Sequence, residues 1–184
     1  MAENAVMKAI RERRSIRKYE EKPVPKEVVD ELLSAAVMAP SAMNRQPWEF
    51  IVVTDRKMIS ELSGGVKKQA WLIGYAQKYA EMFTSGEDLI FYSAPLLVIV
   101  TAPKNYEWAE LDCGILAQTM FLAAHSLGLG SCFVGFGRML NKDAEALRML
   151  GVPPDREICA PLIFGYAAEE KGIPERKAKV TKRV

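Results

Sequence analysis

Hydrophobic and polar positions along this chain change period from segment to segment, and the changes predict a series of helices and strands. Apolar residues recur at the spacing of one helical face within Lys26–Met38, and Pro40 is expected to end that helix. Further helices are predicted over Ala5–Arg11, Met58–Ser63 up to Gly64 and Gly65, Lys67–Phe83, Glu107–Leu127 and Leu140–Leu150. The helix over Lys67–Phe83 would carry aromatic residues at positions 71, 75, 79 and 83, which share one face.

Short apolar runs between these helices predict strands. They cover Glu49–Thr54, Pro95–Thr101, Ser131–Val134 and Glu157–Tyr166. The longest apolar run, Ala94 to Val100, is far shorter than the about 20 residues that cross a bilayer, so it predicts a buried strand. Strands that alternate with helices fit either a doubly wound parallel sheet or an α+β sandwich, and the pattern alone leaves both open.

Length and composition predict an ordinary folded domain. The chain has 184 residues, of which 49% are hydrophobic and 26% charged, so we expect one domain over residues 1–184 that ends in a charged, extended tail over 167–184. The net charge of +2 is too small to favour a nucleic-acid partner. Nine methionines and the many apolar residues fit either a larger core or a surface buried in an oligomer. Residues 1–10 contain Glu3 and no apolar run of signal-peptide length, so a cytoplasmic protein without a membrane partner is expected.

Metal or thiol chemistry is not indicated. The three cysteines, Cys113, Cys132 and Cys159, are far apart and lack the C-x-x-C spacing of zinc sites, so we expect neither a bound metal nor a disulfide. His125 is the single histidine and lies in an apolar predicted helix. It is expected to be a packed or helix-end residue rather than a catalytic base.

Three stretches stand out as candidate binding elements. The first, Arg13-Arg14-Ser15-Ile16-Arg17, places three guanidinium groups and a hydroxyl within five residues, and these are donors that suit a phosphate dianion. The second runs from Ala39 to Trp48, where two prolines bracket hydrogen-bonding side chains, and the third runs from Gly128 to Gly135. A basic cluster by itself is more often a solvated surface, or a patch for nucleic acid or phospholipid, so the order of all three stretches is the more specific signal.

Taken together, the three stretches resemble the FMN-dependent nitroreductase family, which carries R-R-S-x-R near the N-terminus, then P-S-x-x-N-x-Q-P-W, then G-x-G-[ST]-C-x-[IV]-G. The resemblance extends from about Ala5 to Lys179. It implies an α+β fold with a mostly antiparallel sheet flanked by helices, built as an intertwined homodimer with its flavins at the subunit interface. Helix Glu107–Leu127 would then lie in the dimer core, although a helix buried within one subunit fits its composition equally well.

The resemblance also implies which residues hold FMN. Arg17 would stabilise the negative charge that the reduced ring gains near N1 and the C2 carbonyl oxygen, and it is the residue expected to act in catalysis. Asn44 would bond the pyrimidine side of the ring, and a role as an Asx-turn residue is the alternative. Ala42 stands where many relatives have a hydroxyl, so backbone or water would have to replace that bond. The expected cofactor-binding residues are Arg13, Arg14, Ser15, Arg17, Pro40, Ser41, Ala42, Asn44, Val134, Gly135, Phe136, Arg176 and Lys177.

The implied activity is the transfer of two electrons from NADH or NADPH through flavin N5 to a small-molecule acceptor, such as a nitroaromatic or a quinone, by ping-pong kinetics. The segment 64–92 would form a lid or variable region. Within the family, a flavin-fragmenting or dehalogenating enzyme would share the flavin residues and differ in this lid. A flavin-binding or basic-arm interaction module without turnover is the alternative from another class.

Overall fold

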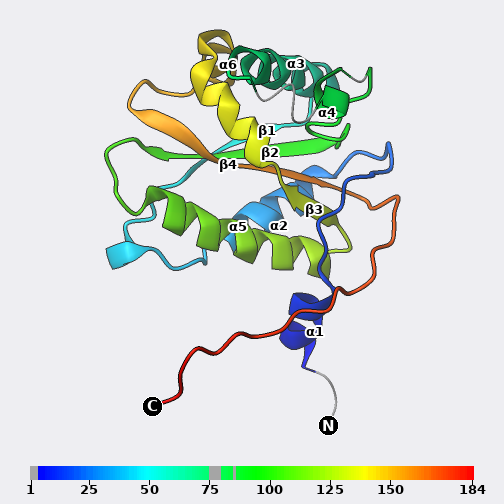
Figure 1. Ribbon diagram of the computed structural model, residues 1–184, viewed down its shortest axis with the longest axis vertical. Coiled ribbons are helices and arrows are strands. Elements are labelled where there is room, and N and C mark those ends of the chain that lie inside the picture. Colours follow the sequence, from blue (N-terminus) through cyan, green and yellow to red (C-terminus); the bar gives the residue numbers. More distant parts are fainter. Residues whose placement is uncertain (1–3, 75–79, 85) are drawn as a thin grey trace.

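A four-stranded antiparallel sheet with helices on both faces forms the body of the protein (Figure 1). The computed structural model describes residues 4–74, 80–84 and 86–184. The strand order is β1-β2-β4-β3, and every neighbouring pair is antiparallel. The strands are β1 (Glu49–Val53), β2 (Leu96–Pro103), β3 (Gly130–Phe133) and β4 (Arg156–Gly165). The α+β prediction is therefore confirmed, and the parallel sheet that the pattern also allowed is wrong.

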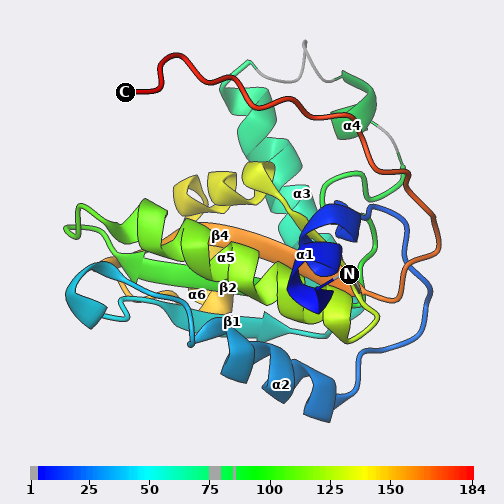
Figure 2. The same ribbon diagram turned by 90° about the horizontal axis from the view of Figure 1, so that it is seen from below.

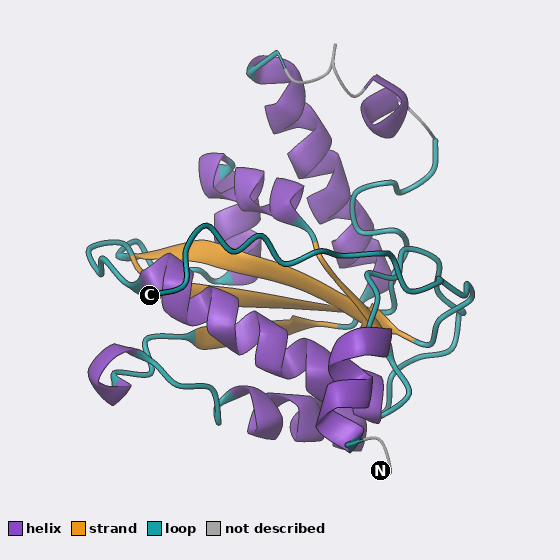
Figure 3. Ribbon diagram, turned by 60° about the horizontal axis from the view of Figure 1, so that its bottom comes forward, coloured by secondary structure: helices purple, strands orange, loops and turns teal. Residues whose placement is uncertain are grey.

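The helices lie in two layers. One layer, which packs on one face of the sheet, contains α2 (Lys26–Ala36) and α5 (Ala109–Ser126). The other contains α3 (Arg56–Leu72), the 3-10 segment η3 (Gly135–Lys142) and α6 (Ala144–Leu150) (Figure 2; Figure 3). The remaining described elements are α1 (Ala5–Glu12), the 3-10 turn η1 (Ala42–Asn44) and α4 (Ala80–Thr84).

The two covered faces explain why β2 is apolar without interruption. Leu96, Val98 and Val100 pack with α2 and α5, whereas Leu97 and Ile99 pack with α3 and α6. All five side chains are fully buried. Successive side chains of a strand point to opposite faces, so a strand covered on both faces has apolar residues at every position.

The predicted helix boundary at Gly64 and Gly65 is wrong, because α3 runs through both glycines. The helix also begins earlier than expected, since the Asp55 carboxylate accepts two backbone N–H groups of its first turn. Gly65 lies against η3, where an added Cβ would be 3.0 Å from the Asp143 carboxylate. A glycine inside a helix costs roughly 1 kcal/mol relative to alanine, and the close approach of α3 to η3 offsets this cost.

The predicted helix over Lys67–Phe83 is also wrong. Helix α3 ends at Leu72, and α4 is a separate short helix. Trp71 is 58% exposed, whereas Phe83 is 4% exposed and belongs to the core, so these two aromatic residues do not share one face. Tyr75 and Tyr79, the other two residues of the predicted aromatic face, lie outside the described residues.

The other predicted elements agree with the structure to within two residues at each end, with one exception. The helix expected over Leu140–Leu150 begins only at Ala144, because residues up to Lys142 belong to η3. Asp143 begins the new helix by accepting two backbone N–H groups of its first turn. The break between η3 and α6 therefore lies at the capping residue Asp143, which the spacing of apolar residues does not identify.

Residues 167–184 contain no helix, and their described pairing is an isolated bridge between Tyr19 and Ala167. The C-terminal end lies apart from the layered body (Figure 1). Within the described part of the chain, no helix is both long enough and apolar enough to cross a membrane.

Candidate active site

The Arg13–Arg17 element lies along the edge strand β3. Ser15 forms an isolated parallel bridge with Ser131, and the Ile16 N–H donates to the Ser131 carbonyl at 3.0 Å. Gly130 permits this approach, because a Cβ at that position would lie 2.8 Å from the Ile16 side chain. The basic cluster therefore lies beside the edge of the sheet and runs parallel to β3.

The beginning of the C-terminal tail folds back over this element. Glu169 accepts a hydrogen bond from the Arg17 backbone N–H at 2.6 Å, and Lys171 donates to the Ser15 carbonyl at 2.8 Å. The Lys171 Nζ and the Glu169 Oε1 form an ion pair at 3.0 Å. A carboxylate and an ammonium group thus hold both ends of the Ser15–Arg17 stretch.

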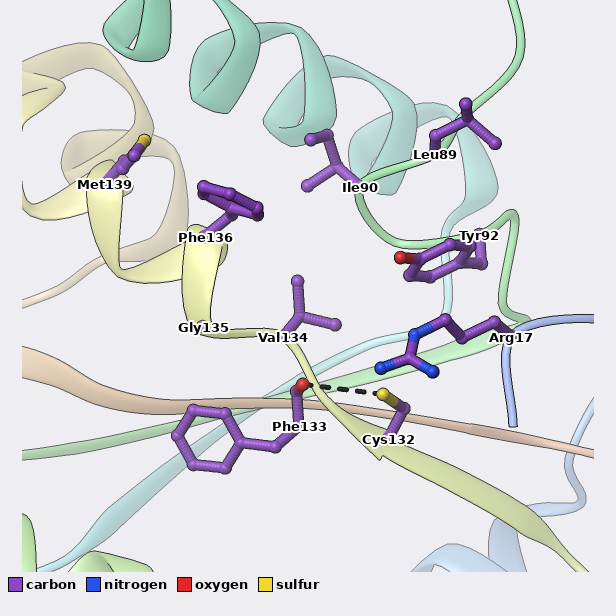
Figure 4. A pocket seen from close by; sticks show the side chains of 10 residues that line it. All are labelled: Arg17, Leu89, Ile90, Tyr92, Cys132, Phe133, Val134, Gly135, Phe136 and Met139. Atoms are coloured by element: carbon purple, nitrogen blue, oxygen red, sulfur yellow. Dashed lines mark hydrogen bonds between the residues drawn. The ribbon is translucent and has the colours of Figure 1, made fainter. Parts of the chain in front are cut away.

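A cavity of about 520 Å³ opens beside Arg17 (Figure 4). Arg17, Val134, Gly135 and Phe136 all line it, so the structure brings these four predicted site residues together. The other lining residues are Leu89, Ile90, Tyr92, Cys132, Phe133 and Met139. A volume of this size and mostly apolar walls with few polar groups are typical of cofactor sites.

A second hollow has a volume of about 480 Å³. It is lined by residues of the arginine element, of the C-terminal end of α5 and of the beginning of the C-terminal tail. Burial, followed by the positive charges of Arg14 and Arg176, lowers the pKa of Arg13 from its ordinary value. Arginine nevertheless stays protonated in proteins, so several positive charges are concentrated here. The charged and titratable lining residues are Glu12, Arg13, Arg14, His125, Glu170 and Lys171.

The two hollows suit the two ends of an FMN molecule. The Arg13 Nε is buried and has no hydrogen-bond partner among the described residues, so an anionic oxygen placed there would satisfy a donor that is costly to leave unpaired. In the Arg17 cavity, a Cβ added to Gly135 would meet no atom within 4 Å, so the wall is open to a flat ring. The residues present therefore fit a phosphate beside Arg13 and a flavin ring beside Arg17.

Within one chain, the loop Pro40–Asn44 does not reach this site. The Ala42 N–H donates to Asp112 Oδ1 at 3.1 Å near the N-terminal end of α5, whereas His125, which lines the Arg13 hollow, lies near its C-terminal end. The span from Asp112 to His125 corresponds to about 20 Å of helix. Figure 2 and Figure 3 show η1 and α1 at opposite ends of α5. The predicted residues that the structure leaves apart from Arg17 are Pro40, Ser41, Ala42 and Asn44.

Several hydrogen bonds nevertheless hold the loop. Asp112, which is 2% exposed, also accepts a hydrogen bond from the Tyr106 hydroxyl at 2.8 Å. The Ser41 hydroxyl oxygen accepts from the Gln46 N–H at 2.9 Å, and the Asn44 side-chain oxygen accepts from the Gln46 amide at 3.1 Å. Asn44 has a φ of 53°, the left-handed backbone that turn-forming asparagines adopt, and its role toward a flavin stays a prediction.

The two basic residues predicted near the C-terminus have different surroundings. The charge of Arg176 acts on Arg13 and contributes to the lowered pKa of that residue. Lys177 is exposed and forms an ion pair with Glu175 at 2.9 Å. Arg176 is therefore the better candidate for a tail residue that reaches the phosphate.

Within the described part of the chain, no group of three or more histidine, cysteine, aspartate or glutamate side chains is placed to hold a metal ion. Cys113, Cys132 and Cys159 are buried and free. Burial raises the pKa of Cys132, which lines the Arg17 cavity, so its thiol is neutral.

Comparison with known proteins decides the family. The family model described as the nitroreductase family matches residues 10–166. The chain belongs to the nitroreductase family. A Methanothermobacter thermautotrophicus protein named NADH dehydrogenase/NAD(P)H nitroreductase is 36% identical over 173 residues, which cover 91% of this chain and 80% of that protein. The Bacillus subtilis FMN reductase [NAD(P)H] is 30% identical over 182 residues, covering 94% of this chain and 70% of that protein.

A solved nitroreductase structure supports the same assignment. The Bacteroides fragilis nitroreductase, a crystal structure with bound FMN, is 31% identical and superposes with a TM-score of 0.84. The match covers 99% of this chain and 98% of that one. The fold of this nitroreductase-family chain is therefore shown by its neighbours as well as by its own sheet order.

Sequence reasoning missed Tyr92, Glu169 and Lys171 at this nitroreductase site. One feature of the sequence could have pointed to Tyr92. Asp88 precedes it in a short loop before β2, and aspartates in such loops commonly accept hydrogen bonds from nearby backbone N–H groups. No feature of the sequence pointed to Glu169 or Lys171, since charged residues near a chain end are usually solvated.

The contact between Glu169 and Arg17 predicts a pH-dependent contribution to stability. Burial acts to raise the pKa of Glu169, but the hydrogen bond from the Arg17 backbone N–H and the nearby Lys171 ammonium outweigh it, so this pKa lies below its ordinary value of 4.5. A carboxyl group with a lowered folded-state pKa stabilises the fold above its ordinary pKa and loses that contribution as the pH falls through the folded-state value. The melting temperature of Glu169→Gln should therefore lie below that of wild type at about pH 6, and the difference should shrink as the pH falls from the ordinary pKa of 4.5 through the lowered folded-state pKa.

Thermal unfolding followed from neutral to acid pH measures this difference. Glu175→Gln is the matched control, because Glu175 is exposed and pairs with Lys177 rather than with the arginine element. A difference for Glu169→Gln that stays constant through the acid range would contradict the assigned contact.

Proposed function

We propose that this protein, an FMN-dependent NAD(P)H oxidoreductase, passes two electrons from NADH or NADPH to nitroaromatics, quinones or related electrophiles by ping-pong kinetics. The observation that carries the proposal is the pair of hollows along the Arg13–Arg17 element, one rich in positive charge and one with apolar walls beside a guanidinium group. The names of two relatives, an NAD(P)H nitroreductase and an FMN reductase, support the choice of reductant and cofactor.

Each part of the arginine element has a role in this proposal. Arg13 and Ser15 would donate hydrogen bonds to the phosphate, Arg14 would lie on the phosphate or ribityl side, and the backbone of Val134–Phe136 would face the edge of the ring. Bound FMN supplies a ring that accepts hydride at N5 and carries the resulting negative charge near N1 and the C2 carbonyl oxygen. Arg17 keeps its proton, so its charge stabilises the reduced ring more than the oxidised ring and favours reduction.

A second copy of the chain would complete the site, as an intertwined homodimer. The loop Pro40–Asn44 is separated from the arginine element by about 20 Å of α5, so it serves a flavin only if that flavin is bound to another copy. The outer face of α5 supports such a contact, because Leu111 is 56% exposed and Ile115 is 36% exposed. Clustered exposed apolar residues commonly mark protein interfaces. The same residues border a hollow of about 250 Å³ whose other lining residues are Pro40, Ser41, Ala42, Trp108 and Asp112.

The ping-pong order rests on shared use of the cavity beside Arg17. The reductant and the acceptor would each have to lie against the ring in this cavity, so one leaves before the other enters. The segment 64–92 is proposed as a lid or variable part of a single domain over residues 1–184, because Leu89, Ile90 and Tyr92 line the cavity. The tail over 167–184 would be anchored to that domain through Glu169 and Lys171.

Steady-state kinetics tests the proposal. The FMN-loaded protein should oxidise NADH or NADPH in the presence of a quinone or a nitroaromatic, and double-reciprocal plots at several acceptor concentrations should give parallel lines. Intersecting lines would contradict the ping-pong order. If neither nucleotide reduces the bound flavin under anaerobic conditions, the protein is not an NAD(P)H oxidoreductase and a module without turnover becomes the better account.

A further inference from the structure

Tyr92 places a hydroxyl group at the Arg17 end of the cavity. The Arg17 Cζ lies 5.8 Å from the centre of the Tyr92 ring, and Figure 4 shows the tyrosine hydroxyl on the same side as the guanidinium group, directed into the cavity. Burial raises the pKa of Tyr92 and outweighs the opposing effect of the Arg17 charge. The hydroxyl therefore stays protonated at neutral pH and is available as a hydrogen-bond donor.

The backbone at Tyr92 is strained. Tyr92 has a φ of 56° and Ser93 a φ of 50°, so two successive residues with side chains occupy the left-handed region that favours glycine. Such a conformation costs free energy and persists only where surrounding contacts enforce it, and it is found most often at functional sites. The strain therefore points to a specific use of the Tyr92 side chain.

Asp88 enforces this conformation. Its carboxylate accepts three backbone N–H groups of the loop 88–93 at 2.9 to 3.2 Å, those of Ile90, Phe91 and Ser93. The Ser63 hydroxyl of α3 donates to the same carboxylate at 2.6 Å, and Ser63 is 3% exposed. The loop is thus tied to a buried position of a long helix. Tyr92 is the polar side chain that this loop presents to the cavity.

We propose that Tyr92 donates a hydrogen bond, beside Arg17, to the part of bound FMN that becomes negatively charged on reduction, and that Asp88 positions it for this task. The inference rests on the proposed function and adds to it a neutral, directional donor next to the fixed charge of Arg17. A donor held in place before the charge develops stabilises that charge without having to reorganise. The tyrosine ring also lies within cation–π distance of the guanidinium group and so limits the orientations of Arg17.

The variant Tyr92→Phe tests the hydroxyl, because it removes that group and keeps the ring and its cation–π contact with Arg17. We expect affinity for oxidised FMN to change by less than about threefold and affinity for reduced FMN to fall about tenfold, since hydrogen bonds to charged groups are the stronger ones. A tenfold change between the two oxidation states lowers a two-electron midpoint potential by about 30 mV. Spectroelectrochemical titration of the FMN-loaded protein measures this shift.

Tyr166→Phe is the matched control. It makes the same chemical change at a tyrosine whose ring lies 4.1 Å from the Lys22 ammonium group and does not line the Arg17 cavity. The control should keep the wild-type potential.

Asp88→Asn tests the positioning role. The asparagine side chain has nearly the shape of the aspartate side chain, but its NH2 group cannot accept a hydrogen bond, so it cannot hold all the N–H groups of the loop. The midpoint potential should therefore fall, as in Tyr92→Phe. Combined with Tyr92→Phe, it should cause no further fall, because Asp88 acts through Tyr92. Fully additive effects in the double variant would overturn the positioning role.

Other outcomes overturn the assignment of Tyr92 itself. A wild-type potential in Tyr92→Phe contradicts it, and a wild-type potential with a raised KM for the acceptor would place the hydroxyl against the acceptor instead. A wild-type protein that takes up no FMN would overturn the proposed function and this inference together. The two failures are therefore distinguishable.

Discussion

Replacing Arg13 by alanine should raise the dissociation constant for oxidised FMN roughly ten- to a hundredfold. The reason is that Arg13 is partly buried beside other cations and offers a buried Nε without a partner among the described residues, so a phosphate there gains a charge-assisted hydrogen bond. Such a bond contributes roughly 1.5 to 3 kcal/mol. Fluorescence titration of FMN measures the change, and Ser15→Ala should shift the affinity in the same direction.

Lys18→Ala is the control for this result, because it removes an exposed neighbouring cation that lines neither hollow. It should leave the affinity nearly unchanged. Equal losses for Arg13→Ala and Lys18→Ala would mean that general positive charge, rather than a phosphate site at Arg13, binds the cofactor.

Arg17→Ala should impair reduction of FMN more than binding of FMN, in contrast to Arg13→Ala. The guanidinium of Arg17 lines the Arg17 cavity, where the flavin ring is proposed to bind, and not the second hollow proposed for the phosphate, so turnover and midpoint potential should fall more than affinity for oxidised FMN. Arg17→Lys should recover part of the potential, since it restores the charge but not the planar fork. A variant that loses flavin yet keeps the wild-type potential when saturated would show that the assigned role of Arg17 is wrong.

Two inactive variants should restore each other's activity when they are folded together. One carries Arg13→Ala and Arg17→Ala, and the other carries Ser41→Ala and Asn44→Ala. In a mixed dimer, one site combines an unaltered arginine element with an unaltered loop from the other chain, and the second site carries both sets of changes. Random pairing makes half of the dimers mixed, so about a quarter of the wild-type sites should return.

The measurement is NAD(P)H oxidation after the two chains are unfolded and refolded together. Chains refolded separately and then assayed in one tube are the control, because they form no mixed dimers if exchange is slow. Activity that stays at the level of this control would contradict a site shared between two copies.

Much of this architecture could be predicted because its signals are local. The apolar run of β2 identifies a strand covered on both faces, and the clustered arginines identify an anion site whatever the fold. The α5 prediction was correct for the same reason, since its apolar length exceeds that of any strand. The order of the strands did not follow from these patterns, and the family resemblance was needed to choose the antiparallel sheet.

The features that were predicted wrongly or missed depend on contacts between residues far apart in the sequence. Glycines at 64 and 65 suggest a helix end, but Gly65 is kept in α3 by its packing against η3. Glu169 reaches the Arg17 backbone across 152 positions of sequence, and no local pattern encodes such a partner. Tyr92 reaches the cavity through a strained turn that Asp88 holds, and Asp88 is itself bound by Ser63 of the distant helix α3.

Light scattering of the purified protein, combined with its flavin absorbance, tests the central claim most directly. We predict a yellow particle with twice the 20.5 kDa mass of the chain and one FMN per chain, because in the proposed dimer the arginine element of each copy would need the Pro40–Asn44 loop of the other. A colourless protein that takes up no added FMN, or a flavin-loaded particle with the mass of one chain, would contradict this account.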